Sequence, residues 1–207
     1  MNNLYIFNPS AGVHKKLPLS PFDKLIVYRY GFGYDQSTDD YLVVSMSYEY
    51  ERTTHLEFFS LRDNAWKEIE STHFPYMNSS ILSYVNGNRG LLYNGAIHWS
   101  AFRHDLKRYV IVTFGLKERK FEEMHFPDDY ISIYDPCIDG LWVFGEFLSV
   151  WDPRYSTIEI WVMKEYKMHS SWTKIVLPTD GLPNEYFILY VLQKVVILLE
   201  GMVILDG

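Results

Sequence analysis

Cysteine is almost missing from this sequence of 207 residues, which contains Cys137 and no other. A single cysteine excludes an internal disulfide, the device that stabilises many secreted domains in oxidising compartments. The N-terminus also lacks the basic stretch and apolar run of a secretory signal peptide. We therefore expect the protein to work in the cytoplasm, the nucleus or both.

Positive charge is scarce as well: the sequence contains 19 Lys and Arg residues and 26 Asp and Glu residues, which gives a formal net charge of −7. Affinity for nucleic acid rests on many Lys and Arg contacts to phosphate, so we expect no nucleic-acid partner. The apolar residues 186–205 have about the length of a membrane span, but Gln193, Lys194 and Glu200 interrupt them. Buried strands joined by tight turns explain this run better, and we expect no membrane partner.

Apolar and aromatic residues are plentiful: 48% of the residues are hydrophobic and 17% are aromatic. Disordered chains lack such residues, so a chain of this composition is expected to fold around a sizeable core. Its length is that of one or two domains. We expect a single domain over residues 1–207.

A repeat is hidden in the spacing of the apolar segments. Four segments share a short apolar strand, a polar turn and a second strand that an aromatic or basic residue opens; they are residues 4–18, 56–69, 110–124 and 158–175. The opening residues Trp66, Phe121 and Trp172 lie 55 and 51 residues apart. A second kind of hairpin lies between these segments, at residues 90–99 and 141–151. Two hairpins in about 50 residues make a four-stranded antiparallel module, the size of a β-propeller blade.

Several residues mark equivalent positions in this repeat. Asn94-Gly95 predicts a two-residue type I′ turn, because both turn positions need a positive φ. Gly145 lies 50 residues after Gly95 and is predicted to have the same role. The tryptophans that recur at blade positions, among them Trp99 and Trp161, are predicted to pack between blades rather than to form a ligand cage.

The sequence therefore predicts an all-β fold, a β-propeller of four-stranded antiparallel blades whose strands we name a to d from the centre outwards. Three full blades are expected at residues 30–69, 90–124 and 141–175, and residues 4–17 supply only strands c and d of another. Three further strands, at residues 188–192, 195–199 and 202–205, are expected to begin a last blade. About three full blades plus two partial ones suggest a truncated ring, unless the terminal pieces close a small four-bladed one. Residues 117–123 are rich in helix formers, but their repeat equivalents predict a turn and a strand.

The residues that usually carry chemistry form no recognisable site. None of the seven His has metal-ligand spacing, and His98 is expected to be a hydrogen-bonded structural residue. Cys137 belongs to no nucleophile signature. The carboxylate pairs at residues 39–40 and 128–129 are interpreted as solvated turn charges, since neighbours on a strand point to opposite faces. Residues 31–33 lack the third glycine and the helix of a phosphate loop. We predict no catalytic residue, no cofactor and no metal.

One face of the predicted propeller is a candidate for partner binding. The b–c and d–a connections emerge there and can vary without disturbing the blades. In this sequence they are rich in Tyr and Arg, residue types that dominate protein interfaces. The predicted partner-binding residues are Tyr76, Met77, Arg103, His104, Tyr130, Tyr134, Arg154, Tyr155 and Tyr186. The alternative, that these aromatic side chains simply cover the blade ends, stays open.

Motifs along nearly the whole chain resemble the plant F-box-associated domain, the propeller that follows an F-box in many ubiquitin-ligase subunits. They lie at residues 4–12, 30–35, 39–44, 59–69, 94–99, 158–166 and 171–174. The double-glycine kelch signature of some relatives is absent. The resemblance implies that the propeller selects a target protein, whose identity is unknown, while the F-box docks the Skp-type adaptor of a cullin–RING ligase. No F-box precedes Leu4, so we expect contact with the adaptor only through an F-box that this chain lacks.

Three functions compete on this basis. A protein-interaction module, resembling the substrate receptor of an SCF-type ubiquitin ligase, comes first. A truncated and non-functional remnant is the alternative. A glycan-active propeller enzyme is a weaker one, because it needs carboxylates on the innermost strands, and residues 90–93 and 141–144 carry none. We therefore predict that the chain is not an enzyme.

Overall fold

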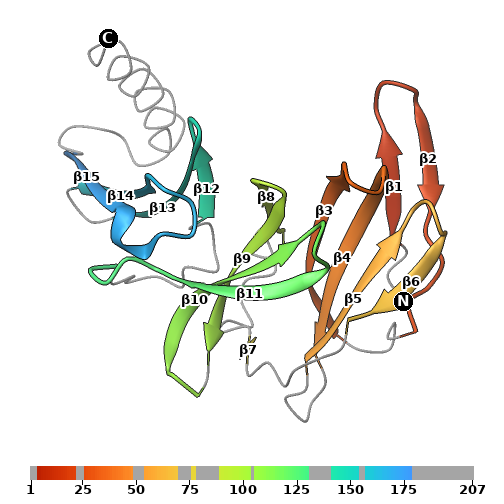
Figure 1. Ribbon diagram of the computed structural model, residues 1–207, viewed down its shortest axis with the longest axis horizontal. Helices are drawn as coiled ribbons and strands as arrows, with labels where there is room; N and C mark the ends of the chain where they lie inside the picture. Colours follow the sequence, from red (N-terminus) through yellow and green to blue (C-terminus); the bar gives the residue numbers. More distant parts are fainter. Residues whose placement is uncertain are drawn as a thin grey trace.

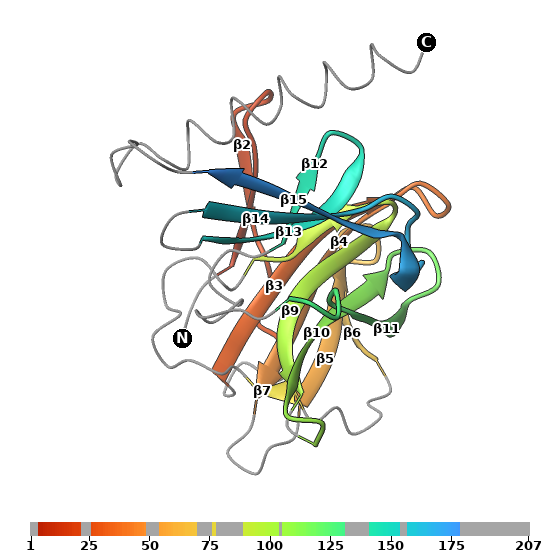
Figure 2. The same ribbon diagram turned by 90° about the vertical axis from the view of Figure 1, so that its left-hand side faces the viewer.

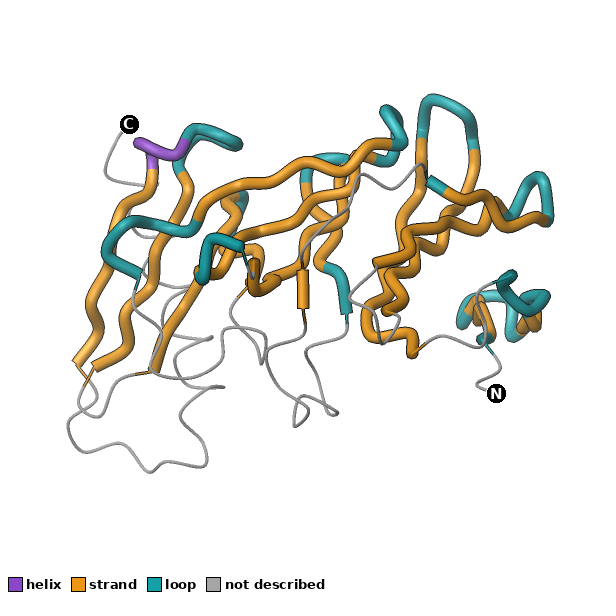
Figure 3. Tube along the Cα trace, turned by 90° about the horizontal axis from the view of Figure 1, so that it is seen from below, coloured by secondary structure: helices purple, strands orange, loops and turns teal. Residues whose placement is uncertain are grey.

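In the computed structural model of this protein, the described residues form antiparallel sheets, their connecting turns and one short 3-10 helix (Figure 1). The parts of the chain that it describes are residues 4–21, 26–48, 54–69, 76–77, 89–103, 105–130, 141–153 and 157–178. The sheets follow one another along the molecule, from the hairpin near the N-terminus to the sheet that carries the helix (Figure 3). The all-β, propeller-like fold is confirmed, and in the described residues the blades form an arc that does not close into a ring.

The sheets follow chain order, and each complete blade has four antiparallel strands, to which one further short strand is added in blade 3. Blade 1 is the hairpin β1 (Tyr5–Asn8) and β2 (Val13–Lys16). Blade 2 is β3 (Ile26–Asp35), β4 (Asp40–Tyr48), β5 (Thr54–Ser60) and β6 (Ala65–Glu68). Blade 3 is β8 (Leu91–Tyr93), β9 (Ala96–Arg103), β10 (Arg108–Gly115) and β11 (Lys120–His125). Blade 4 is β12 (Leu141–Phe144), β13 (Phe147–Pro153), β14 (Thr157–Met163) and β15 (Trp172–Pro178), with the 3-10 helix η1 (His169–Ser171) before β15.

The register of blade 1 identifies its two strands as c and d. Phe7 pairs with His14 as Phe59 pairs with Trp66 in blade 2, and both hairpins have turns of four residues. The prediction that residues 4–17 supply strands c and d of a blade is therefore confirmed. The expected last strands, at residues 188–205, lie outside the described residues. Residues 117–123 form a turn and the start of β11, as the repeat predicts and helix propensity does not.

Local turn rules explain the a–b hairpins, with one correction. Asn94 and Gly95 have φ of 46° and 71°, the two positive values of a type I′ turn. In blade 4 Gly145 has φ of 58°, whereas Glu146, the second turn residue, is not among the described residues with positive φ. Because Phe144 pairs with Phe147, Gly145 occupies the position of Asn94 rather than that of Gly95. The prediction of an identical role is wrong, and the repeat is 51 residues here.

One segment that was expected to be a loop forms a strand. β7 (Tyr76–Met77) lies in the connection from blade 2 to blade 3 and pairs antiparallel with the end of β9. The reason is the unequal length of the inner strands. β8 has three residues and β9 has eight, so the edge of β9 near Arg103 is left without β8 and is taken by β7.

The core lies between blades, where neighbouring sheets bury each other's apolar faces. Figure 2 shows β9 and β10 of blade 3 lying over β3 and β4 of blade 2. Strand β3 approaches blade 3 so closely that a Cβ on Gly31 would lie 2.5 Å from Ile97 Cγ2 and 2.7 Å from Trp99 Cζ2. A Cβ on Gly33 would lie 2.7 Å from Leu116 Cδ1. Real Cβ contacts do not reach such distances, so residues 31–33 serve blade packing.

The aromatic residues that open the d strands share one environment, the junction with a neighbouring blade. Trp66 Nε1 donates to the carbonyl of Pro18, 2.9 Å away, and Trp172 Nε1 donates to that of His125, 3.3 Å away. Phe121 has no donor and packs against Phe114, with ring centroids 4.9 Å apart. Of the other anchors, Trp99 and Trp161 are fully buried, and Trp99 Nε1 donates to the carbonyl of Tyr30 at 3.1 Å.

Buried polar groups also join the blades. Asp35 is 3% exposed and accepts from Arg119 Nη2 of blade 3 at 2.8 Å. Burial raises the pKa of Asp35, but hydrogen bonds from Thr38 and Ser37 and the charge of Arg119 outweigh burial and hold it at about 2. Asp40 corrects the prediction of solvated turn charges: it is buried and accepts from Ser60 Oγ at 2.5 Å.

His98 joins blades 3 and 4, and its expected structural role is confirmed. The ring is fully buried, with Nδ1 3.2 Å from the carbonyl of Leu91 and Nε2 2.9 Å from the hydroxyl of Tyr166. A carbonyl only accepts, so Nδ1 carries the proton and Nε2 accepts from Tyr166. Burial, more than any other cause, lowers the pKa of His98 to about 4 and raises that of Tyr166 to about 12.

Candidate functional site

Four of the predicted partner-binding residues are described by the structure, and they gather around the b–c and d–a connections of blade 3. Tyr76 and Met77 form β7, and Tyr76 pairs with Arg103 of β9, which brings two separate predictions together. Tyr130 follows the end of β11. The remaining predicted residues lie outside the described part of the chain; they are His104, Tyr134, Arg154, Tyr155 and Tyr186.

Arg103 is engaged within its own blade. Its Nε lies 3.0 Å from Asp105 Oδ1 in the b–c turn, and its Nη1 lies 2.7 Å from Glu123 Oε2 in β11. The hydrogen bonds to Asp105 and Glu123 raise the pKa of Arg103 above its ordinary value. Two carboxylates already compensate this guanidinium, so the arrangement positions the turn and leaves little charge for a ligand.

Tyr130 contributes to the junction of blades 3 and 4. Its ring stacks on Phe126, with centroids 4.9 Å apart, and meets Trp161 edge-on at 5.1 Å. Its backbone N–H donates to the carbonyl of Pro127 at 3.0 Å. The residue is half-buried, so one part of it covers the blade end and another part stays accessible. Its partner-binding role stays a prediction.

Next to these residues lies a pocket of about 370 Å³. It is lined by residues 125–128 with Arg108, Tyr109 and Tyr130. Nη2 of Arg108 lies 3.0 Å from Nε2 of His125. A guanidinium only donates, so His125 accepts through Nε2 and is neutral in this contact. Arg108 has no carboxylate partner among the described residues, which sets it apart from Arg103.

The rim of this pocket includes a second histidine. His169 Nε2 lies 3.1 Å from the carbonyl of Phe126 and 3.5 Å from Asp128 Oδ1, and its ring meets that of His125 edge-on at 6.0 Å. The arrangement combines an aromatic lining, the cation of Arg108, which has no carboxylate partner among the described residues, and the carboxylate of Asp128 at the rim. It suits an apolar side chain that carries or adjoins an anionic group. No group of three metal-ligating side chains gathers in the described residues.

The sequence analysis missed Arg108, His125 and their pocket. Arg108 opens β10 after the b–c turn, and His125 ends β11. The two residues meet because β10 and β11 pair antiparallel. A usable signal existed: in the predicted blade both positions lie at the end that carries the d–a connection.

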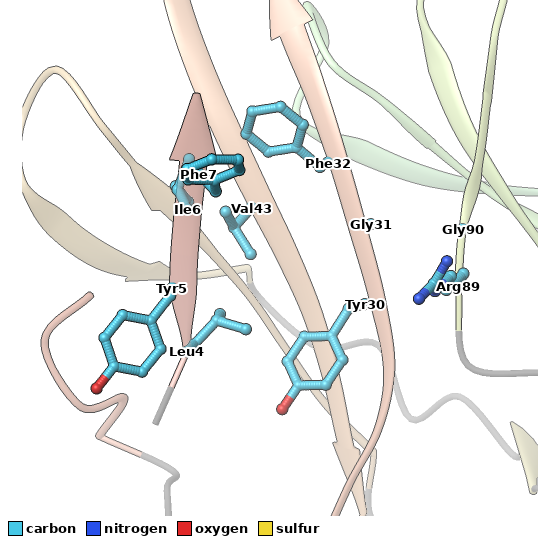
Figure 4. A pocket seen from close by; sticks show the side chains of 10 residues that line it. All are labelled: Leu4, Tyr5, Ile6, Phe7, Tyr30, Gly31, Phe32, Val43, Arg89 and Gly90. Carbon is cyan, nitrogen blue, oxygen red and sulfur yellow. The ribbon is translucent and has the colours of Figure 1, made fainter. Parts of the chain in front are cut away.

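A second hollow, of about 350 Å³, lies between β1 and β3 (Figure 4). Leu4 to Phe7 form one side, and Tyr30, Phe32 and Val43 line blade 2 on the other. Among the described residues that line it, Arg89 is the charged one. This hollow, which we call the β1 groove, belongs to none of the sites predicted from the sequence.

The comparisons with known proteins agree with this geometry. Residues 1–202 match the family described as the F-box associated beta propeller domain. The chain belongs to this family. Among its relatives in Arabidopsis thaliana, F-box protein CPR1 is 30% identical over 84% of this chain and 47% of its own length. F-box/kelch-repeat protein At3g23880 is 27% identical over 96% of this chain and 53% of its own length.

Membership in the F-box associated family accounts for the repeat. The match runs from the c–d hairpin of blade 1 to beyond the end of blade 4, so the blades described here are blades of that domain. The chain spans about half the length of the curated relatives that it matches. In the described residues, no helix is long and apolar enough to cross a membrane.

Proposed function

We propose that this propeller is the target-recognition part of an F-box protein that works in an SCF-type ubiquitin ligase of the cytoplasm or nucleus. The observation that carries the proposal is the match of residues 1–202 to the F-box associated domain, together with relatives that are F-box proteins. Propeller blades hold connections on one rigid face. In this role the propeller holds a protein and performs no reaction.

The pocket beside Arg108 supports a binding role on the b–c and d–a face. Arg108 is exposed, its guanidinium has no carboxylate partner among the described residues, and aromatic rings adjoin it. Arginine beside aromatic residues is typical of the centre of protein interfaces. We propose that a target places an apolar residue and a carboxylate here.

An enzymatic role has no comparable support. Among the described innermost strands, β8 and β12 carry no carboxylate. Asp35 at the end of β3 is buried and paired with Arg119. A glycosidase needs two carboxylates that face a substrate, and the described strands offer none in that position.

Capture from plant extract tests the proposal. The 207-residue chain, joined to the F-box of a relative such as CPR1, should recover the Skp-type adaptor together with a reproducible set of other proteins. Arg108→Gln should reduce that set several-fold without changing recovery of the adaptor. Lys117→Gln removes an exposed cation from the β10–β11 turn at the opposite end of the blade and is the matched control. Equal capture by both variants would remove the pocket from the proposal, and no specific capture by the parent chain would refute the proposal itself.

A further inference from the structure

The pocket beside Arg108, which we call the Arg108 pocket, has a largely apolar lining. Phe126 and Pro127 are buried, and the ring of Tyr130 stacks on Phe126 with centroids 4.9 Å apart. Tyr109 lines the pocket from β10 and is half-buried. The volume of about 370 Å³ lies near the lower end of the range of about 300–1,000 Å³ that is usual for ligand pockets. A pocket of this size suits a short group of a partner rather than a long segment.

Arg108 is held by one contact and keeps donors for a ligand. Its Nη2 donates to Nε2 of His125 at 3.0 Å, and it has no carboxylate partner among the described residues. A guanidinium carries several N–H groups in one plane, and a carboxylate can accept from two of them at once. Arg103, on the same blade, already binds Asp105 and Glu123. In the described part of this blade end, the place for a carboxylate ligand is therefore at Arg108.

Asp128 places a carboxylate on the rim of the same pocket. Its side chain is 91% exposed, and its Oδ1 lies 3.5 Å from Nε2 of His169. That nitrogen is closer to the carbonyl of Phe126, at 3.1 Å, so the carboxylate of Asp128 keeps lone pairs for a further donor. A doubly charged group such as a phosphate would be repelled by this carboxylate. The pocket therefore suits a ligand with one negative charge, which binds Arg108, and one N–H donor, which binds Asp128.

The last residue of a protein chain combines these features. An apolar residue at that position carries its side chain, the α-carboxylate and a backbone N–H around one Cα. An internal Asp or Glu beside an apolar residue fits less well, because neighbouring side chains on an extended segment point to opposite faces. Side chains two residues apart share a face but lie about 7 Å apart along the segment, and such a segment must also leave the pocket in both directions.

We propose that the Arg108 pocket binds the C-terminal residue of a target protein. The α-carboxylate accepts from Arg108, and the backbone N–H of the same residue donates to Asp128. The apolar side chain packs on Phe126 and Tyr130. His125 is a positioning residue, because its contact holds the guanidinium in place. The inference rests on the proposed function and narrows the class of target to proteins that end in an accessible apolar residue.

Fluorescent peptides test the role of the α-carboxylate. Each has fluorescein at its N-terminus and the sequence Gly-Ser-Gly-Ser-Gly followed by Leu, Phe, Met or Val, and each is made with a free carboxylate and with a C-terminal amide. The best free acid should bind the 207-residue chain with a dissociation constant on the order of 100 µM. Its amide should bind at least about tenfold more weakly, because the amide has no charge for Arg108. Adding two glycines after the apolar residue should weaken binding by a similar factor.

Variants of the chain assign each contact. Arg108→Gln should bind the free acid and the amide equally, whereas Lys117→Gln, the matched control, should keep the difference between them. Methylation of the last backbone nitrogen removes the donor to Asp128. The methylated peptide should bind the parent chain several-fold more weakly than the unmethylated one, and the two should bind Asp128→Ala equally. Arg108 and Asp128 are exposed, so both variants should fold like the parent, and circular dichroism checks that they do.

Three results would overturn the inference: equal binding of acid and amide by the parent chain, a preference for the acid that survives in Arg108→Gln, and no binding of any free acid up to millimolar concentration. Capture from plant extract tests the proposed function separately. If capture depends on Arg108 while acid and amide bind equally, the C-terminal ligand is wrong and the proposed function stands. If the parent chain captures nothing specific, the proposed function itself is wrong.

Discussion

Acidification should weaken the junction between blades 3 and 4 through His98. In the folded chain this ring is neutral and fully buried, and its pKa is about 4. An unfolded chain has a histidine pKa of about 6.5. Between these two pKa values the unfolded state binds the proton more readily than the folded state. The contribution of the neutral His98 ring to the stability of the fold is therefore complete above about pH 6.5 and is lost as pH falls toward about 4.

The size of the effect follows from the two pKa values. At pH 5.5 the folded chain should lose roughly 1–2 kcal/mol of unfolding free energy through this ring, and at pH 4.5 roughly 2–3 kcal/mol. His98→Asn places an amide N–H near the position of Nδ1, keeps the bond to Leu91 and removes the titration. It should be less stable than the parent by roughly 2–4 kcal/mol at pH 7.5, because it leaves a cavity and an unpartnered Tyr166 hydroxyl.

Urea unfolding, followed by tryptophan fluorescence at pH 7.5, 6.5, 5.5 and 4.5, measures both quantities. The difference in unfolding free energy between the parent and His98→Asn should narrow by roughly 2–3 kcal/mol between pH 7.5 and 4.5. The effects of titratable groups that both proteins share cancel in this difference. His14→Asn, at an exposed histidine, is the control and should keep a constant gap. A constant gap for His98→Asn would refute the inference that burial keeps this ring neutral.

Three further predictions concern the other blade junctions. Asp35→Asn should lower the free energy of unfolding by roughly 2 kcal/mol at pH 7, as measured by urea unfolding. The difference from the parent should stay constant from pH 8 to 5. The reason is the lowered pKa of Asp35, because of which its contribution fades only as pH falls through about 4 to 2. Gly31→Ala should cost roughly 2–4 kcal/mol, since its Cβ would overlap Ile97 and Trp99, and thermal unfolding by circular dichroism measures it. Trp66→Phe and Trp172→Phe should each cost about 1–2 kcal/mol through the loss of one hydrogen bond between blades, measured in the same way.

The glycine prediction has an internal comparison. Gly12 has a positive φ, and a Cβ added there would meet nothing within 4 Å, so Gly12→Ala should cost only the strain of its backbone, about 1 kcal/mol. Equal losses at Gly12 and Gly31 would contradict the close approach of blades 2 and 3. A broad, non-cooperative melt of the parent chain would instead favour a non-functional remnant.

Local rules account for the parts that sequence reasoning predicted. Asn94-Gly95 forms its turn because two positive φ angles suit these residues wherever they occur. The recurring hairpins, and Trp66, Phe121 and Trp172 at the start of the d strands, follow from spacing alone. Gly145 shows where spacing fails as a predictor. It lies at the first position of its turn, which Asn94 occupies in blade 3, and not at the second position, which Gly95 occupies. Counting residues along the repeat does not distinguish these two positions, although they belong to different turn types.

Burial and long-range pairing escaped prediction for a different reason. Asp40 looks like a solvated turn charge until Ser60 and Arg62, on the next hairpin, reach it with hydrogen bonds. The Arg108 pocket exists because β10 and β11 pair in one register, and β7 forms because β8 is shorter than β9. Each outcome depends on partners that are remote along the chain.

The chain alone thus determined that it forms β-hairpins, how often they recur and which family they belong to, because turn chemistry and apolar spacing act over a few residues. The folded arrangement decided which charges are buried and which guanidinium lacks a carboxylate partner in the described residues. These properties depend on how one blade lies against the next, and solvation and hydrogen bonding are set by that contact.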